Sequence, residues 1–108
     1  MKNKLTGNKY KVDLGSLKVE LFFESDSSMV FTILEGGELA KAGYNERVET
    51  IVSEIRPMVY MVSWKEISGA TVTHLEDHEN GILFSNATLP DGNFYNMEGT
   101  ITHIQDKI

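Results

Sequence analysis

The sequence predicts an all-β fold, a small antiparallel eight-stranded up-and-down barrel, and three observations lead to this prediction. Short segments rich in β-branched and aromatic residues recur along the 108 residues, each bounded by turn-forming residues. No clear long helix lies between them, which favours a closed antiparallel barrel over alternating strands and helices. Two of the turns, Asn80-Gly81 and Asp91-Gly92, contain dipeptides that accept the positive φ angles of tight hairpins.

Four strands are expected in the first half of the chain. They are NKYKVDL (8–14), before Gly15-Ser16; LKVELFF (17–23), before ESDSS; MVFTIL (29–34), before EGGELAKAG; and RVETIVSEI (47–55), which Arg56-Pro57 closes. Within 17–23 the odd positions are apolar and most even positions are charged. Because successive side chains of a strand point to opposite faces, the odd positions are expected to face inward.

The segment 39–55 also fits a helix. Val48, Ile51, Val52 and Ile55 follow the i, i+3, i+4, i+7 spacing of an amphipathic helix. Gly43 and the run of β-branched residues oppose that interpretation, and the next strand needs a partner, so we prefer a strand. A short helix near residues 37–42 is compatible with the composition there.

Four more strands are expected in the second half. They are VYMVSWKE (59–66), closed by Ser68-Gly69; ATVTHLED (70–77), closed by Glu79-Asn80-Gly81; ILFSNATL (82–89), closed by Pro90-Asp91-Gly92; and NFYNMEGTITHI (93–104). The length fits one domain over residues 1–108, without a linker.

Composition excludes several classes of function. Ten basic and sixteen acidic residues give a net charge of -6, which repels nucleic acid and anionic membrane surfaces. The absence of cysteine excludes disulfides, thiolate catalysis and cysteine-ligated metal. No apolar run approaches the length of a membrane helix. We therefore expect an unprocessed soluble protein, cytoplasmic, with no nucleic-acid or membrane partner.

The stretch MVYMVSWKEISG raises the main functional question. Its alternation places Tyr60, Val62 and Trp64 on one side, and Glu66 ends that side. An eight-stranded barrel is just wide enough to hold one small ligand. If this side lines a cavity, Glu66 is the candidate catalytic acid or base and, with Tyr60 and Trp64, a candidate ligand-binding residue. If it faces water, Glu66 is an ordinary surface residue.

Further polar candidates follow in the next two strands. His74 and His78 would share a helix face, but in a strand they lie roughly 13 Å apart along the chain, too far for one metal ion. We therefore expect no metal site. His74 and Asn86 are expected to line the cavity, although either face of the 82–89 strand has polar residues. A structural hydrogen-bond network of Glu66 with Tyr60, His74 or Asn86 is the alternative.

The motifs VSWKE, GATVTHLEDHENG and NATLPDGNF followed by EGT resemble those of MoaF-like domains, a branch of the calycin or lipocalin-like barrels. The similarity covers residues 7–104. The barrel is also similar to the phenolic acid decarboxylases, whose central strand has the same valine, serine, tryptophan and glutamate. That resemblance implies that Trp64 and Glu66 face a cavity. The tyrosine pair of those enzymes falls on Val12 and Leu14, and Arg47 or Lys41 is only a loose substitute for their arginine.

Three hypotheses of function follow. The first is a small-molecule-binding barrel for a small apolar or aromatic ligand, with no cofactor. The alternative is a cofactor-independent lyase or isomerase that acts on a small acid, such as an aromatic one, with Glu66 transferring the proton. The third is an interaction module, in which exposed apolar residues such as Phe22, Met58 and Met61 form a homodimer.

Overall fold

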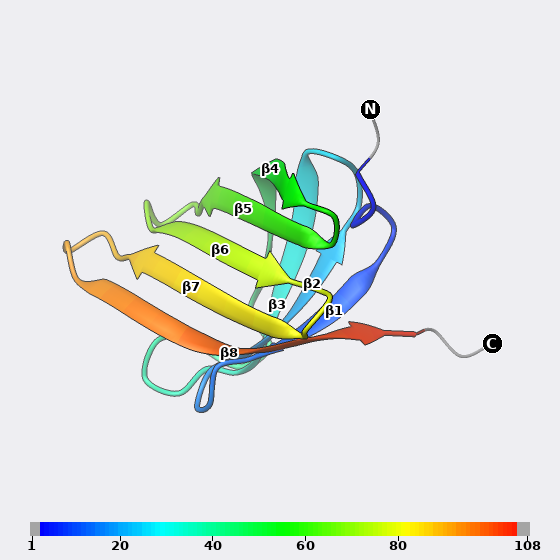
Figure 1. Ribbon diagram of the computed structural model, residues 1–108. Coiled ribbons are helices and arrows are strands. Elements are labelled where there is room, and N and C mark those ends of the chain that lie inside the picture. Colours follow the sequence, from blue (N-terminus) through cyan, green and yellow to red (C-terminus); the bar gives the residue numbers. More distant parts are fainter. Residues whose placement is uncertain (1–2, 106–108) are drawn as a thin grey trace.

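The structure is a computed structural model that describes residues 3–105, and these form a closed barrel of eight antiparallel strands (Figure 1). Each strand pairs with the next along the chain, and β8 returns to pair with β1. The strands are β1 (Lys9–Asp13), β2 (Lys18–Phe23), β3 (Ser28–Glu35), β4 (Asn45–Arg56), β5 (Val59–Lys65), β6 (Thr71–Asp77), β7 (Ile82–Thr88) and β8 (Phe94–Ile104). The predicted fold class and all eight predicted strands are confirmed.

The ambiguous segment 39–55 forms a strand for most of its length. β4 pairs with β3 over residues 45–49 and with β5 over residues 50–56. Val48 and Val52 are four residues apart, so they share a face in a strand as well as in a helix. That coincidence is why the helical spacing was ambiguous. Residues 37–42 form turns in place of the short helix, with Leu39 N and Ala40 N both donating to Gly36 O.

The two longest strands, β4 and β8, each pair with one neighbour through their first half and with another through their second half. β8 pairs with β7 through its first half and with β1 through its second half, and Thr100 is the residue at which the two pairings meet. Gly99 lies beside that point, where a Cβ atom would be 1.8 Å from the carbonyl oxygen of Asp13. Only glycine allows this close backbone approach.

One end of the barrel is packed solid. Tyr10, Phe23 and Met29 lie there among the buried residues, and Leu5 from the N-terminal turn joins the same cluster with 2% of its surface exposed. Side-chain contacts hold that turn in place, since Asp26 accepts hydrogen bonds from Asn3 N and from Thr6 Oγ1. The N-terminal turn therefore closes this end.

Among the residues that the structure describes, no helix has the length and apolar character needed to cross a membrane.

Candidate functional site

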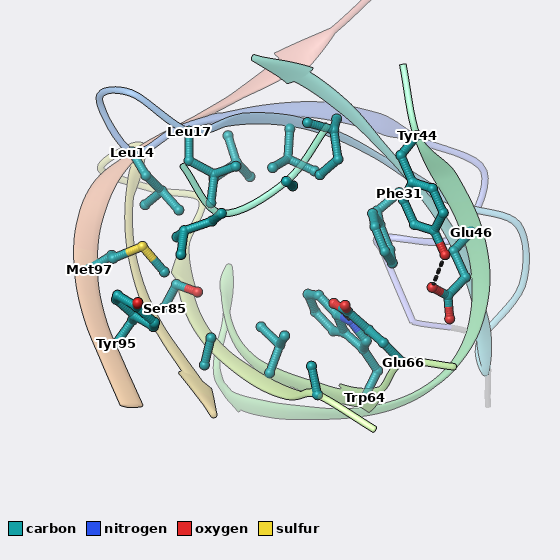
Figure 2. A pocket seen from close by; sticks show the side chains of 18 of the residues that line it. Leu14, Leu17, Phe31, Tyr44, Glu46, Trp64, Glu66, Ser85, Tyr95 and Met97 are labelled. Carbon is teal, nitrogen blue, oxygen red and sulfur yellow. Dashed lines mark hydrogen bonds between the residues drawn. The ribbon is translucent and has the colours of Figure 1, made fainter. Parts of the chain in front are cut away.

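The other half of the barrel is hollow, with a cavity of about 320 Å³ (Figure 2). Its mouth lies at the end with the β1–β2, β3–β4, β5–β6 and β7–β8 connections, opposite the N-terminal turn. The wall is mainly apolar and comes from all eight strands and their connections. It includes Val12, Leu14, Leu17, Val19, Leu21, Phe31, Ile33, Leu39, Ala40, Val72, Ala87, Leu89 and Met97.

Trp64 and Glu66 lie at the mouth, where β5 ends. Both line the cavity, and the indole Nε1 of Trp64 donates a hydrogen bond to Oε2 of Glu66 at 3.2 Å. Burial raises the pKa of Glu66, the Trp64 hydrogen bond lowers it, and the charge of Glu46 raises it, with a net increase. Glu66 is thus a partly desolvated carboxyl group at the entrance.

Glu46 is a second carboxylate at the mouth, at the start of β4. Its Oε1 accepts a hydrogen bond from the Tyr44 hydroxyl at 2.7 Å, and its Oε2 accepts one from the backbone nitrogen of Ile67 at 2.7 Å. The first of these bonds is drawn in Figure 2. These contacts fix Glu46 between the β3–β4 and β5–β6 connections, close enough for its charge to act on Glu66.

Three aromatic rings form one side of the cavity. Phe31 stacks on Trp64 with ring centroids 6.4 Å apart, and Phe31 also contacts Tyr44 at 6.1 Å. Tyr44 is 46% exposed, whereas Phe31 and Trp64 are buried. The rings therefore extend from the solvent-exposed rim to the interior.

His74 and Ser85 are polar residues deeper in the cavity. They are direct cross-strand partners on β6 and β7, and both face inward. The ring of His74 packs edge-on against Trp64, with centroids 4.8 Å apart. Together they place hydrogen-bonding groups on an otherwise apolar inner wall.

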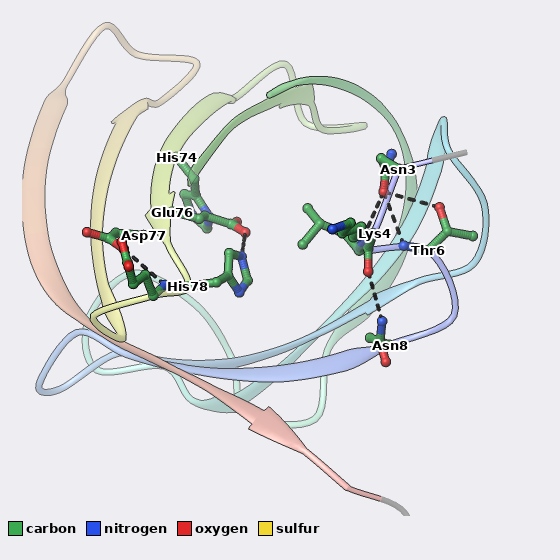
Figure 3. Close-up of polar contacts among 10 residues, drawn as sticks. Asn3, Lys4, Thr6, Asn8, His74, Glu76, Asp77 and His78 are labelled. Atoms are coloured by element: carbon green, nitrogen blue, oxygen red, sulfur yellow. Dashed lines mark hydrogen bonds and ion pairs between the residues drawn. The ribbon is translucent and has the colours of Figure 1, made fainter. Parts of the chain in front are cut away.

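Beneath His74, the side chain of Glu76 is fully buried between two histidines. Its Oε2 lies 3.0 Å from His74 Nδ1, and its Oε1 lies 3.0 Å from His78 Nε2. Figure 3 shows the three side chains projecting into the barrel from β6 and the turn after it. Burial acts to raise the pKa of Glu76, but the hydrogen bonds and charges of the two histidines outweigh it, so the pKa is lowered.

Tyrosines enclose this buried cluster. Tyr10 contacts His78 at a centroid distance of 4.7 Å, and Tyr60 contacts it at 5.8 Å. Burial, followed by the charges of Glu76 and Tyr60, raises the pKa of Tyr10 to about 12. The cluster thus forms the boundary between the cavity and the packed end.

Of the five predicted site residues, Trp64, Glu66 and His74 line the cavity together. Tyr60 faces inward and is 3% exposed, but it lies in the packed end. It is four positions before Trp64 on the strand, which corresponds to roughly 13 Å. Asn86 was placed wrongly. It lies on the exposed outer face of β7 and accepts a hydrogen bond from Asn96 at 2.6 Å, because the register turns Ser85 and Ala87 inward.

Five residues of the site were not predicted from the sequence: Tyr44, Glu46, Phe31, Ser85 and Glu76. Glu76 could have been predicted from the strand period. Val72, His74 and Glu76 occupy every second position and so share one face, and the apolar Val72 indicates that this face points inward. Tyr44 and Glu46 carry no comparable signal, since they reach the mouth only through the β3–β4 connection and the start of β4.

The positions that correspond to the decarboxylase tyrosine pair, Val12 and Leu14, form part of the apolar wall. Arg47 lies outside the cavity lining and makes a two-pronged hydrogen bond to Glu24, with Nε to Oε1 at 2.7 Å and Nη2 to Oε2 at 2.9 Å. Lys41 lies on the wall near the mouth. The tyrosine pair of those enzymes therefore has no equivalent at these positions, and of the two loose substitutes for their arginine, Lys41 lines the cavity and Arg47 does not.

The apolar residues considered for a homodimer lie on separate parts of the surface. Met58 and Met61 are 47% and 42% exposed, at the β4–β5 turn and on β5. Phe22 lies on β2, with the Lys9 ammonium 5.6 Å from its ring centroid. On β6 and β7, Leu75 and Phe84 continue the exposed row that Met61 begins. Homodimer formation stays a prediction.

Within residues 3–105, no cluster of three or more histidine, aspartate or glutamate side chains has an arrangement that could hold a metal ion. His74 and His78 contact different oxygens of Glu76. His103 lies elsewhere, with its Nε2 3.1 Å from Asn8 Oδ1.

Comparison with known proteins gives a family and a fold. The family model described as MoaF-like matches residues 6–102. No curated protein matches the chain. Among solved structures, a protein from Burkholderia vietnamiensis that has been proposed to be a β-lactamase aligns with a TM-score of 0.89 and 21% sequence identity. The alignment covers 96% of this chain and 99% of that one, so the whole barrel is shared.

Proposed function

This chain belongs to the MoaF-like family, and we propose that it is a binding protein for a small apolar or aromatic molecule. The ligand occupies the hollow half of the barrel and enters between the β3–β4 and β5–β6 connections. Its apolar body contacts the aliphatic and aromatic wall, and its polar group reaches Glu66 or His74.

One observation carries this proposal: the cavity is closed at one end and open at the other. A volume of about 320 Å³ lies at the small end of the roughly 300–1,000 Å³ range of small-molecule sites. Such sites combine apolar walls with a few polar groups that fix the orientation of the ligand. Here Glu66, His74 and Ser85 are those polar groups.

The test uses the neutral fluorescent probe N-phenylnaphthylamine. Trp64 is the single tryptophan of the chain and lies on the cavity wall, so a bound probe should quench its emission by energy transfer. Ala87→Phe adds a ring inside the cavity and should weaken binding at least about tenfold. Asn86→Phe adds the same ring on the outer face of the same strand and should leave binding unchanged.

Circular dichroism and thermal melting establish that each variant is folded. If Ala87→Phe fails to fold, Ala87→Leu serves as the smaller blocking variant. Equal affinity of the wild type and a folded cavity-filled variant would show that the probe binds elsewhere and would overturn the cavity assignment.

A second candidate function is proton transfer on a small acid by Glu66, as a lyase or isomerase reaction without a cofactor. The observation in its favour is the position of Glu66 on the cavity wall. Burial there raises the pKa of Glu66, and a carboxyl group with a higher pKa is a better proton acceptor when ionised. The test is turnover of a panel of small aromatic acids by the wild type. Turnover that is lost in Glu66→Gln while binding persists would support it, and the absence of turnover across the panel would count against it.

A further inference from the structure

We infer that the mouth of the barrel selects an organic cation, and that the ligand is an amine with an apolar or aromatic body. The ammonium group would lie against Glu66 and Glu46 and in contact with the aromatic rings beside them. This inference rests on the proposed function and adds the chemical class of the ligand.

The two carboxylates have unused hydrogen-bonding capacity. In the described part of the chain, the side-chain carboxylate of Glu66 accepts one hydrogen bond, from Trp64, and only at Oε2. Glu46 accepts one hydrogen bond at each oxygen, from Tyr44 and from the backbone of Ile67. Neither carboxylate forms an ion pair with any residue between 3 and 105. Since a carboxylate can accept about four hydrogen bonds, both have room for a cationic donor.

An aromatic surface lies beside these carboxylates. Trp64 and Phe31 stack at 6.4 Å, and Tyr44 extends the group to the rim (Figure 2). The face of an aromatic ring attracts a cation, and indole does so most strongly. A site that combines aromatic faces with a carboxylate is suited to an alkylammonium group, because it supplies both attractions at once.

The charged residues at the mouth carry a net negative charge. Lys41 also lines the cavity there, but it is exposed and forms no ion pair with Glu46 or Glu66. The mouth therefore has two carboxylates and one ammonium group. A ligand with a carboxylate would meet net repulsion, and the overall charge of -6 would attract cations toward the protein at low ionic strength.

A neutral alcohol can donate a hydrogen bond to Glu66, but it lacks the charge that strengthens that bond. A bond from an alcohol to a carboxylate has one ionised partner, whereas a bond from an ammonium group has two and adds the attraction between opposite charges. The amine should therefore bind more tightly than an alcohol of the same size and shape, and this difference is the measurable signature of the inference.

The experiment compares three probes that share a phenyl ring and a short chain: phenethylamine, phenethyl alcohol and phenylacetate. Isothermal titration calorimetry at neutral pH and low salt measures each affinity. The amine is expected to bind about tenfold more tightly than the alcohol. Phenylacetate should bind more weakly than either.

Three variants locate the preference. Glu66→Gln keeps an oxygen acceptor for Trp64 and should reduce amine affinity about tenfold, with little change for the alcohol. Glu46→Gln should have a smaller effect in the same direction. Glu49→Gln is the matched control, because it removes the same charge from an exposed position of β4 that does not line the cavity. It should change neither affinity, and melting curves establish that all three variants fold.

The outcomes separate this inference from the proposed function. Equal binding of amine and alcohol, tighter binding of phenylacetate, or loss of amine affinity in Glu49→Gln alone would overturn the amine inference. Failure of all three probes would overturn it as well. In each case the N-phenylnaphthylamine measurement decides independently whether the cavity binds small molecules.

Discussion

The Nδ1 atom of His74 lies 3.0 Å from Oε2 of Glu76, a side chain without solvent exposure. His78 contacts the other oxygen at the same distance from the opposite side. Burial of a carboxylate is costly unless its oxygens are hydrogen-bonded, and here both are. The contact involves Nδ1 of His74, a residue that lines the cavity. The other ring nitrogen, Nε2, is not bonded to Glu76.

Removal of the Glu76 carboxylate should strongly destabilise the fold. Glu76→Ala leaves two buried histidines without their shared partner and creates a cavity, and we expect a loss of about 3–5 kcal/mol in the free energy of unfolding. Urea denaturation measures this loss. The control is Glu98→Ala on the exposed face of β8, which should change stability by less than about 0.5 kcal/mol. A small effect of Glu76→Ala would contradict the structural role of the cluster.

Stability should fall at acid pH because the pKa of Glu76 is lowered by folding. Such a group stabilises the folded state above its unfolded pKa, near the ordinary value of 4.5, and this contribution is lost as pH falls through the folded pKa. Urea denaturation from about pH 7 to about pH 3 should show the decline. Glu76→Gln should flatten it.

Two other carboxyl groups, Glu24 and Asp77, have a pKa that folding lowers, so both contribute to the same decline. Glu24 has a pKa lowered to about 2 by its hydrogen bonds from Arg47 and then Ser28, although the pair lies at the surface. Glu24→Gln separates its share from that of Glu76. If the stability of Glu76→Gln falls as steeply at acid pH as that of the wild type, the buried carboxylate is not the source of the decline.

Glu66→Gln should stabilise the protein at neutral pH. Burial raises the folded pKa of Glu66, so the folded state is favoured below the unfolded pKa and loses stability as pH rises through the folded pKa. An uncharged isostere avoids this loss, and we expect a gain of roughly 0.5–2 kcal/mol at neutral pH. Well below pH 4.5 the gain should vanish, because both side chains are then neutral. Thermal unfolding at the two pH values checks both statements.

Met58→Gly should relieve backbone strain in the β4–β5 turn. Met58 has a φ of 69°, the left-handed region that side chains other than glycine rarely adopt, and Pro57 precedes it as in a type II turn. This conformation costs roughly 1–2 kcal/mol for an ordinary residue, so glycine should stabilise the fold by about 1 kcal/mol after its greater unfolded entropy is deducted. Met58→Val, with a β-branched side chain, should destabilise it. Unchanged melting temperatures for both variants would contradict the strained turn.

Leu5→Ala should weaken the closed end of the barrel. Leu5 is 2% exposed and is the residue through which the N-terminal turn joins the hydrophobic core. Truncation of a buried leucine costs about 2–5 kcal/mol, partly through the cavity that remains. Leu34→Ala is the matched control, since Leu34 is 40% exposed and its truncation should cost far less. Denaturation midpoints compare the two, and similar losses would indicate that the N-terminal turn does not close the barrel.

Local patterns in the sequence determined the strands. Alternation and turn residues suffice because each strand needs a period of two and each hairpin needs a tight turn. Gly81 and Gly92 have the positive φ angles that their turns predicted. The side of β5 that faces inward was also readable, because Trp64 and Tyr60 are too bulky and apolar to be favoured in water.

Tertiary structure decided which inward residues meet in the cavity. Tyr60 and Trp64 share a face of β5, yet one lies in the packed end and the other at the mouth, because the N-terminal turn fills only one half of the barrel. Glu46, at the start of β4, and Glu66, just after β5, line the same mouth. His78, in the turn after β6, contacts Glu76. Strand periodicity fixes the face of a side chain, whereas its depth and partners depend on the closure and register of the whole barrel.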